Sequence, residues 1–199
     1  MPITSHEAAQ IAAKISPDFD KVSMYYDLAK YPVVNYGKFK QSFSSLNIVN
    51  TEISDSLLWK WGHWGKKSIP RHHRDLVTEI DGLWVQFVGS GAGQASNQTF
   101  DWWSGQLNRR TTYITVAYIT HLVHHAKRLP IIDQHNFRAM NSLLRDVKTT
   151  HSGKKKPSTW QDIVELGTFM TEVSKALGNK SFEELDRFLM MYGKHVVER

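Results

Sequence analysis

Helix-start signals recur along this chain and constrain its fold more than any other feature of the sequence. Three pairs of residues have the spacing of a capping box, in which two side chains three residues apart accept hydrogen bonds from each other's backbone N–H groups. The pairs are Thr4 with Glu7, Ser158 with Gln161, and Ser181 with Glu184. Glycines mark the expected ends of the last two helices, at Gly178 and Gly193. No convincing strand pair accompanies them, so we expect an all-α globule of about eight to nine helices.

The first half of the chain is expected to hold shorter helices joined by loops. They run from about Asp18 to Tyr31, from Asn35 to Leu46, from Ser54 to Gly62 and from Arg71 to Ile80, the last with Ser68 as cap and Pro70 just inside. We favour a helix for the apolar run 83–88, with a strand as the alternative. The glycine-rich segment 89–97 is expected to be a loop, because the Gly-Lys-Ser/Thr of a phosphate-binding loop does not follow it.

Length and composition limit the remaining possibilities. The 199 residues fit a single helical domain, 1–199, or two lobes at about 1–95 and 96–199. The chain has no cysteine, which excludes disulfides and thiolate-held zinc or iron–sulfur sites, and we expect no cofactor. No long apolar window and no signal-peptide pattern is present, so we expect no membrane partner and a location that is cytoplasmic (nucleoid-associated) or otherwise intracellular. The sequence leaves the oligomeric state open.

The charge favours a polyanionic partner, although many basic proteins bind no nucleic acid. Lys and Arg outnumber Asp and Glu by 25 to 19, giving a net charge of +6, and neutralising phosphates with such side chains releases counterions. Tryptophans alternate with basic residues in segment 59–67, and segment 151–157 contains three adjacent lysines. The candidate DNA contacts there are Trp61, Trp64, Lys66, Lys67, Lys154, Lys155 and Lys156. The alternatives are tryptophans anchored in the core and a solvated linker.

The segment 110–126 is expected to be a central helix with much of its surface buried. Its apolar positions recur every three or four residues, and its many β-branched residues need tertiary packing to stay helical. His121 and His125 lie four apart and could ligate a metal. Leu122, however, stands where the His-Glu-x-x-His pattern needs Glu, so we favour packed or surface histidines and expect no metal.

A proline turn follows this helix and contains the carboxylate of greatest interest. Pro130 ends the helix, Ile131 and Ile132 bury the connection, and Asp133 stands where the next helix needs an N-cap. Asp is a favoured N-cap because its side chain accepts the first free amide hydrogens. A carboxylate at the edge of an apolar turn is also suited to electrostatic work. The residues alone leave both interpretations open.

The segment Leu-Pro-Ile-Ile-Asp-Gln-His-Asn-Phe-Arg-Ala, residues 129–139, resembles the stretch around the catalytic aspartate of the helix-hairpin-helix DNA glycosylases. In that superfamily an apolar pair precedes Asp, and x-His-x-x-Arg follows on the next helix; Asp133, His135 and Arg138 match. A charged linker, a long helix and a terminal helix follow in similar order, so the resemblance covers roughly 100–197. It implies a DNA partner, a flipped base, and Asp133 stabilising the sugar cation or orienting water at C1′.

Departures from the family pattern narrow the implied activity. The family hairpin has two glycines, whereas segment 104–110 has one, and Arg109 and Arg110 are expected to replace its amide contacts to phosphate with charge. The family's lyase lysine has no counterpart in 114–116, which disfavours Schiff-base chemistry. The resemblance therefore implies a monofunctional DNA N-glycosylase of base excision repair. The alternatives are a non-catalytic helical DNA-binding module and a helical regulator that binds another protein.

Overall fold

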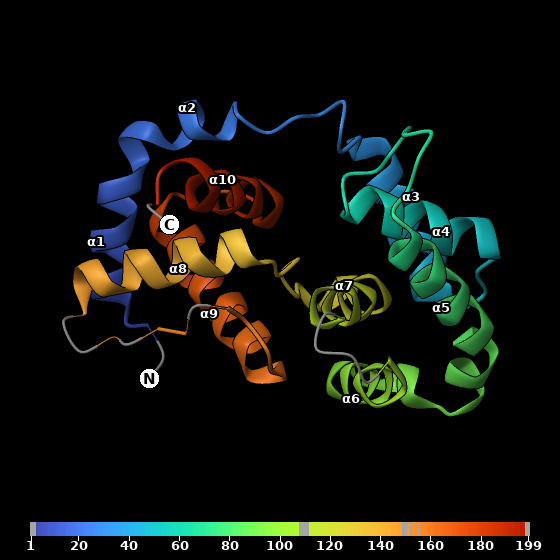
Figure 1. The fold of residues 1–199 in the computed structure, drawn as a ribbon. Helices are drawn as coiled ribbons and strands as arrows, with labels where there is room; N and C mark the ends of the chain where they lie inside the picture. The colour runs from blue at the N-terminus through green and yellow to red at the C-terminus, as the bar shows by residue number, and fades with distance from the viewer. Residues whose placement is uncertain (1–2, 108–111, 149–150, 152, 155, 198–199) are drawn as a thin grey trace. The chain divides into compact units, whose positions relative to one another are not determined.

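The computed structural model describes residues 3–107, 112–148, 151, 153–154 and 156–197 (Figure 1). Within these residues the protein is all-helical and contains no strand, which confirms the predicted fold class. The described part of the chain contains nine α-helices of eleven residues or more and a shorter helix, α2, of five residues.

The chain divides into two compact units. The terminal unit comprises residues 1–26 and 128–199 and contains α1 (Ser5–Ile15), α2 (Phe19–Ser23), α8 (Gln134–Val147), α9 (Trp160–Ala176) and α10 (Phe182–His195). The central unit comprises residues 27–127 and contains α3 (Val33–Ser45), α4 (Asn50–Lys60), α5 (Arg71–Gly89), α6 (Ser96–Leu107) and α7 (Tyr113–Val123). The lobes that the sequence allowed were divided at about residue 95. In the structure, the terminal unit is instead made of an N-terminal and a C-terminal segment of the chain.

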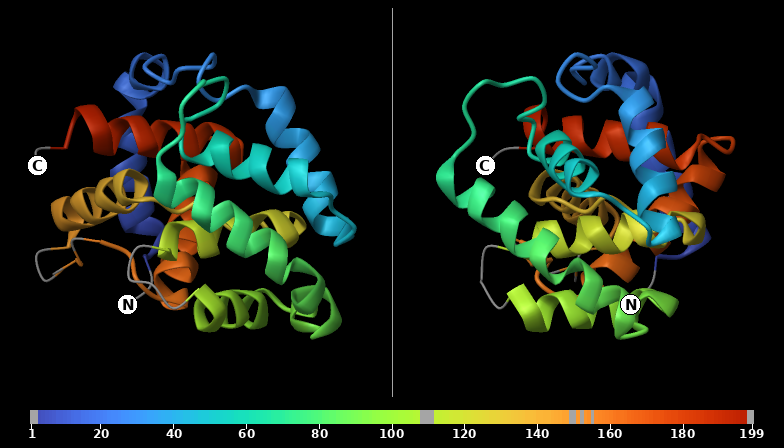
Figure 2. Two further views of the ribbon diagram at one scale, coloured as in Figure 1. Left: turned by 45° about the vertical axis from the view of Figure 1, so that its right-hand side comes forward. Right: turned by 90° about the vertical axis from the view of Figure 1, so that its right-hand side faces the viewer.

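The terminal unit is built around α8 and α10, which pack along each other (Figures 1 and 2). Their inner faces bury Phe137, Met140 and Leu143 from α8 and Leu185, Phe188 and Leu189 from α10. Helix α1 covers α8 and α9, and α2 covers α10. The Phe19 ring stacks on the Phe188 ring with centroids 4.6 Å apart, so aromatic packing fastens the N-terminal segment to the end of the chain.

Gly193 allows the end of α10 to approach the start of α8 at backbone distance. It is buried, and a Cβ built on it would overlap the carbonyl oxygen of His135. We had expected this glycine to end the last helix, and that was wrong, because α10 continues to His195. Gly193 is needed for the close approach of two helices and not as a C-terminal stop.

The central unit encloses α7, as the sequence predicted. Every residue from Thr115 to Val123 is buried, with α3 and α6 packed against the helix. The Trp103 ring is fully buried and lies against the rings of Trp84 and Phe87 at centroid distances of 5.8 and 5.2 Å. Tertiary packing of this kind compensates for the β-branched residues of α7.

Several helix boundaries differ from the predicted ones because side chains redirect the backbone. Helix α2 ends at Ser23, well before Tyr31, and the Asp27 carboxylate binds the amides of Ala29 and Lys30 in a turn. Helix α4 starts at Asn50, before the expected Ser54, because the Glu52 carboxylate accepts the Val49 amide at 3.1 Å.

Two further start signals were also placed wrongly. Residues 71–80 and 83–88 belong to the single helix α5, whose N-cap position is Pro70 and not Ser68. Helix α9 is capped by Thr159 with Asp162, one residue after the predicted pair. The Asp162 carboxylate selects this register because it accepts the amides of Ser158 and Thr159 at 2.7 and 2.8 Å.

Substituting Gly193 tests the close approach of α10 to α8. Gly193→Ala should lower the free energy of unfolding by about 1–3 kcal/mol, because the added methyl group forces the two backbones apart. Gly82→Ala is the matched control. Gly82 lies inside α5 with nothing within 4 Å of its Cβ position, so this variant should raise the free energy of unfolding by about 0.5–1 kcal/mol. Urea denaturation measures both. Equal effects would contradict the assigned role.

Candidate functional site

The turn before α8 holds Asp133 in a fixed orientation. Asp133 has extended backbone angles (φ −144°, ψ 179°), and its Oδ1 accepts hydrogen bonds from the amides of His135 and Asn136 at 2.7 and 3.0 Å. The Asn136 Oδ1 in turn accepts the Asp133 amide at 2.8 Å. The predicted N-cap is therefore confirmed, and it is part of a complete capping box.

Asn136 is the residue of this site that sequence reasoning missed. Its side chain is fully buried, and its Nδ2 donates to the Ile131 carbonyl at 2.7 Å and to the Asp186 carboxylate of α10 at 3.1 Å. One amide side chain thus closes the turn on both sides and attaches it to α10. A polar residue at the third helical position was a visible signal of a capping box, but the partner on α10 required the tertiary structure.

The arrangement suits a carboxylate that acts electrostatically. Pro130 and Ile132 are buried beneath the turn, while Asp133 itself is half-buried. The carboxylate lies at the N-terminus of a 14-residue helix, where the aligned peptide dipoles favour negative charge. Two backbone amides fix its orientation, so the side chain does not have to be ordered when another molecule binds.

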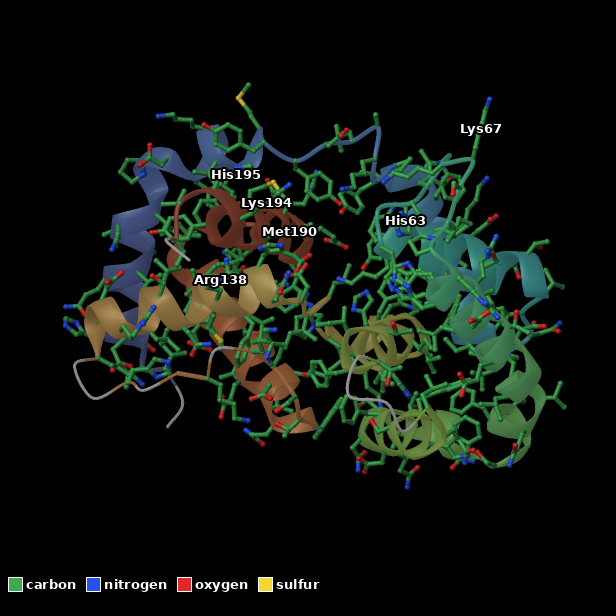
Figure 3. All side chains as sticks on the ribbon, viewed as in Figure 1. His63, Lys67, Arg138, Met190, Lys194 and His195 are labelled. Atoms are coloured by element: carbon green, nitrogen blue, oxygen red, sulfur yellow. The ribbon has the colours of Figure 1, made fainter. Side chains whose placement is uncertain are left out.

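His135 and Arg138, which also match the glycosylase pattern in segment 129–139, belong to the terminal unit as well. His135 is half-buried in the first turn of α8. Arg138, labelled in Figure 3, is half-buried. Its guanidinium donates to the Gly193 carbonyl of α10 at 3.2 Å. That carbonyl belongs to the last turn of α10, where partial negative charge accumulates. Arg138 therefore has a structural role in this unit, and its DNA contact stays a prediction.

In the segment 151–157, which precedes α9, Lys154 forms an ion pair within the protein. Lys154 pairs with Asp162 at 3.0 Å, and the Asp162 side chain is only 3% exposed. Burial alone would raise the pKa of the Asp162 carboxyl, but hydrogen bonds from the Ser158 amide, Lys154 and Thr159 hold it below its ordinary value. Lys156 is exposed. Lys155, like Arg109 and Arg110, lies outside the described residues.

The predicted tryptophan and lysine contacts lie in the central unit. The half-buried Trp61 ring stacks on His73, with centroids 4.0 Å apart and planes 13° apart. The half-buried Trp64 meets the edge of Phe39 at 6.3 Å. Lys66 and Lys67 are exposed. The structure thus places Asp133, His135 and Arg138 in one compact unit and these four residues in the other.

Of the two histidines considered as metal ligands, His121 is buried in α7, and half-buried His125 lies in the turn after that helix. His121 is hydrogen-bonded to the Tyr36 hydroxyl at 2.5 Å in the interior. His124 is bonded to the Thr99 hydroxyl at 2.8 Å, and that hydroxyl donates to the Ala92 carbonyl. No group of three potential metal ligands occurs among the residues that the structure describes.

Comparison with known proteins gives no match to any family model, curated protein or solved structure. The likeness to the helix-hairpin-helix glycosylases therefore stays a resemblance of the segment around Asp133 and of the order of the elements that follow it. Within the described part of the chain, no helix has the length and apolar character that crossing a bilayer requires.

Buried His124 should make the protein less stable in acid. Burial, and to a smaller extent the charge of Lys127, lowers the pKa of His124 to about 4. Between pH 6.5 and pH 4 the unfolded chain therefore binds a proton on His124 that the folded protein does not bind. The contribution of neutral His124 to the free energy of unfolding is therefore complete above pH 6.5, and about 3 kcal/mol of it is lost as the pH falls to 4. Urea denaturation across this range should show a smaller decline in His124→Gln. Equal declines would remove His124 as the cause.

Capping by Asp133 can be measured apart from its charge. Asp133→Ala should cost about 1 kcal/mol of unfolding free energy, because two amides lose their acceptor, whereas Asp133→Asn should cost only a few tenths, since Asn caps helices equally well. Ser181→Ala, which removes the cap of α10 in the same unit, supplies the comparison. Thermal and urea unfolding give the values. A loss in Asp133→Asn as large as in the alanine variant would contradict a simple cap.

Proposed function

We propose that this protein is a DNA-binding protein that removes a damaged or mispaired base by monofunctional N-glycosylase chemistry, with Asp133 as the catalytic carboxylate. The observation that carries the proposal is the fixed, half-buried Asp133 at the N-terminus of α8, within a segment that resembles the catalytic stretch of a DNA glycosylase superfamily. The basic character of the chain supports the choice of DNA as partner.

The proposed reaction needs little from the protein beyond positioning and charge. The bond between C1′ and the base nitrogen breaks, and its electron pair leaves with the base. Asp133 stabilises the positive charge that develops on the sugar, and a water molecule adds to C1′. The proton that this water releases balances the one that the departing base takes up. The product is an intact strand with an abasic site. No lysine is assigned a covalent role, because the segment 114–116 offers none.

A non-catalytic DNA-binding module is the second candidate, and the capping geometry favours it. Oδ1 of Asp133 already accepts two amides, which is a complete structural reason for an aspartate at this position. Arg138 likewise has an internal acceptor on α10. Base release, and not DNA affinity, separates the two candidates.

The full-length protein should release a base from at least one duplex in a panel containing uracil, 8-oxoguanine, alkylated purines and mismatches. Hot alkali converts each abasic site into a strand break that a gel reveals. Asp133→Asn should lose at least about 100-fold in rate, as expected when transition-state charge stabilisation is removed, while keeping its fold and DNA affinity. Asp20→Asn, a carboxylate on an exposed surface of the same unit, is the matched control and should retain full activity.

Other outcomes identify the alternatives. Binding whose logarithm falls with the logarithm of salt concentration, without base release from any duplex, would establish the non-catalytic module. Equal base release by wild type and Asp133→Asn would remove Asp133 from the mechanism. No binding even at low salt would end both DNA hypotheses and leave the protein-interaction regulator.

A further inference from the structure

Two histidines at the turn between α4 and α5 form a directly hydrogen-bonded pair. The Nε2 of His63 lies 3.0 Å from the Nδ1 of His73. Trp61 stacks on the other imidazole of this pair, His73, at 4.0 Å and fixes the plane of that ring. The ring of His72 lies 4.2 Å from that of His73. We call His63 and His73 the histidine pair.

The charged groups acting on the pair are cationic or imidazoles. Burial lowers the pKa of His63, and Lys66, Lys30 and His72 lower it further. Burial also lowers the pKa of His73 to about 4, with His72 and His63 adding to the effect. Lys30 packs over Gly62, whose positive φ of 66° and lack of a side chain make room for it.

The surroundings of the pair add further positive charge. Arg71 and Arg74 are exposed on the same helix as His73, and Arg71 lies 3.9 Å from the Asp75 carboxylate. Residues 27–127 hold eleven Lys and Arg against seven Asp and Glu, while the rest of the chain holds fourteen against twelve. Four of the six excess positive charges therefore belong to the central unit, which contains the pair.

Proton counting shows what the pair can offer. Two neutral imidazoles carry two protons on four nitrogens, and one of these protons lies in the bond between the rings. The neutral pair therefore has one outward N–H and one outward lone pair. The Nδ1 of His63 is one of the two nitrogens that point away from the other imidazole. It is shielded from solvent and has no hydrogen-bond partner among the described residues. One added proton turns both outward nitrogens into donors, whereas a second would break the internal bond.

We propose that the turn between α4 and α5 is an anion-binding site for a phosphate group of the DNA backbone, at which the histidine pair takes up one proton. This inference rests on the proposed DNA binding, but it does not require catalysis at Asp133. A phosphate beside Lys30 and Lys66 offsets the positive potential that keeps the pair neutral, so the pair takes up a proton when the phosphate binds. The stacked Trp61 ring holds the His73 ring in place from one face.

Proton uptake makes DNA affinity depend on pH at constant salt. The full-length protein, titrated with a fluorescein-labelled 20-base-pair duplex, should bind more tightly as the pH falls from 8 to 6, by at most about tenfold per unit for one proton. His73→Gln and His63→Gln should lose most of this dependence. His6→Gln, an exposed histidine in the other unit, is the control and should keep it.

A measurement on the unmodified protein guards against variants that fail to fold. The NMR titration of the His63 and His73 imidazole protons should move to higher pH when the duplex is added. Movement with inorganic phosphate but not with the duplex would overturn DNA as the ligand. Measurable DNA binding with the same pH dependence in wild type, His63→Gln and His73→Gln would overturn this site and leave the proposed function intact. No DNA binding at any pH would overturn both.

Discussion

The backbone contact between the end of α10 and the start of α8 is the constraint on which the Asp133 turn depends. Gly193 brings α10 so close to His135 that no side chain fits between them. Arg138 donates to the Gly193 carbonyl at this contact, and Asn136 donates to Asp186 nearer the start of α10. The Gly193 carbonyl in the last turn of α10 accepts the Arg138 guanidinium of α8, so the end of α10 with partial negative charge meets a cation. Movement of α10 would release Asn136 from Asp186 and loosen the turn that it closes.

Local signals predicted those parts of the fold that depend only on neighbouring residues. The capping boxes at Thr4 and Ser181 are present where the sequence placed them, and Asp133 is the N-cap of α8, because an N-cap and its partner lie within four residues. The buried central helix was predicted as well, since its apolar pattern leaves little polar surface. The limits of prediction begin where a residue several turns or helices away decides the outcome.

Three residues illustrate those limits. Gly193 resembled a helix stop, yet its role is set by the His135 carbonyl on another helix. Asn136 resembled an ordinary helix residue, but its amide bridges to Asp186, fifty positions later. Lys154 resembled a free cation in a basic run, although the buried Asp162 holds it. In each case the deciding partner comes from tertiary packing, which spacing along the chain does not encode.

Capping and catalysis make compatible demands on Asp133. An ionised carboxylate can accept about four hydrogen bonds, and the two amides on Oδ1 use only part of that capacity. A group that stabilises developing charge must also be held in place before the reaction begins, because reorienting it during the reaction would raise the barrier. The cap provides that rigidity. Charge, and not the capacity to cap, is therefore the property that distinguishes aspartate from asparagine here, and it serves the dipole of α8 as well as the proposed chemistry.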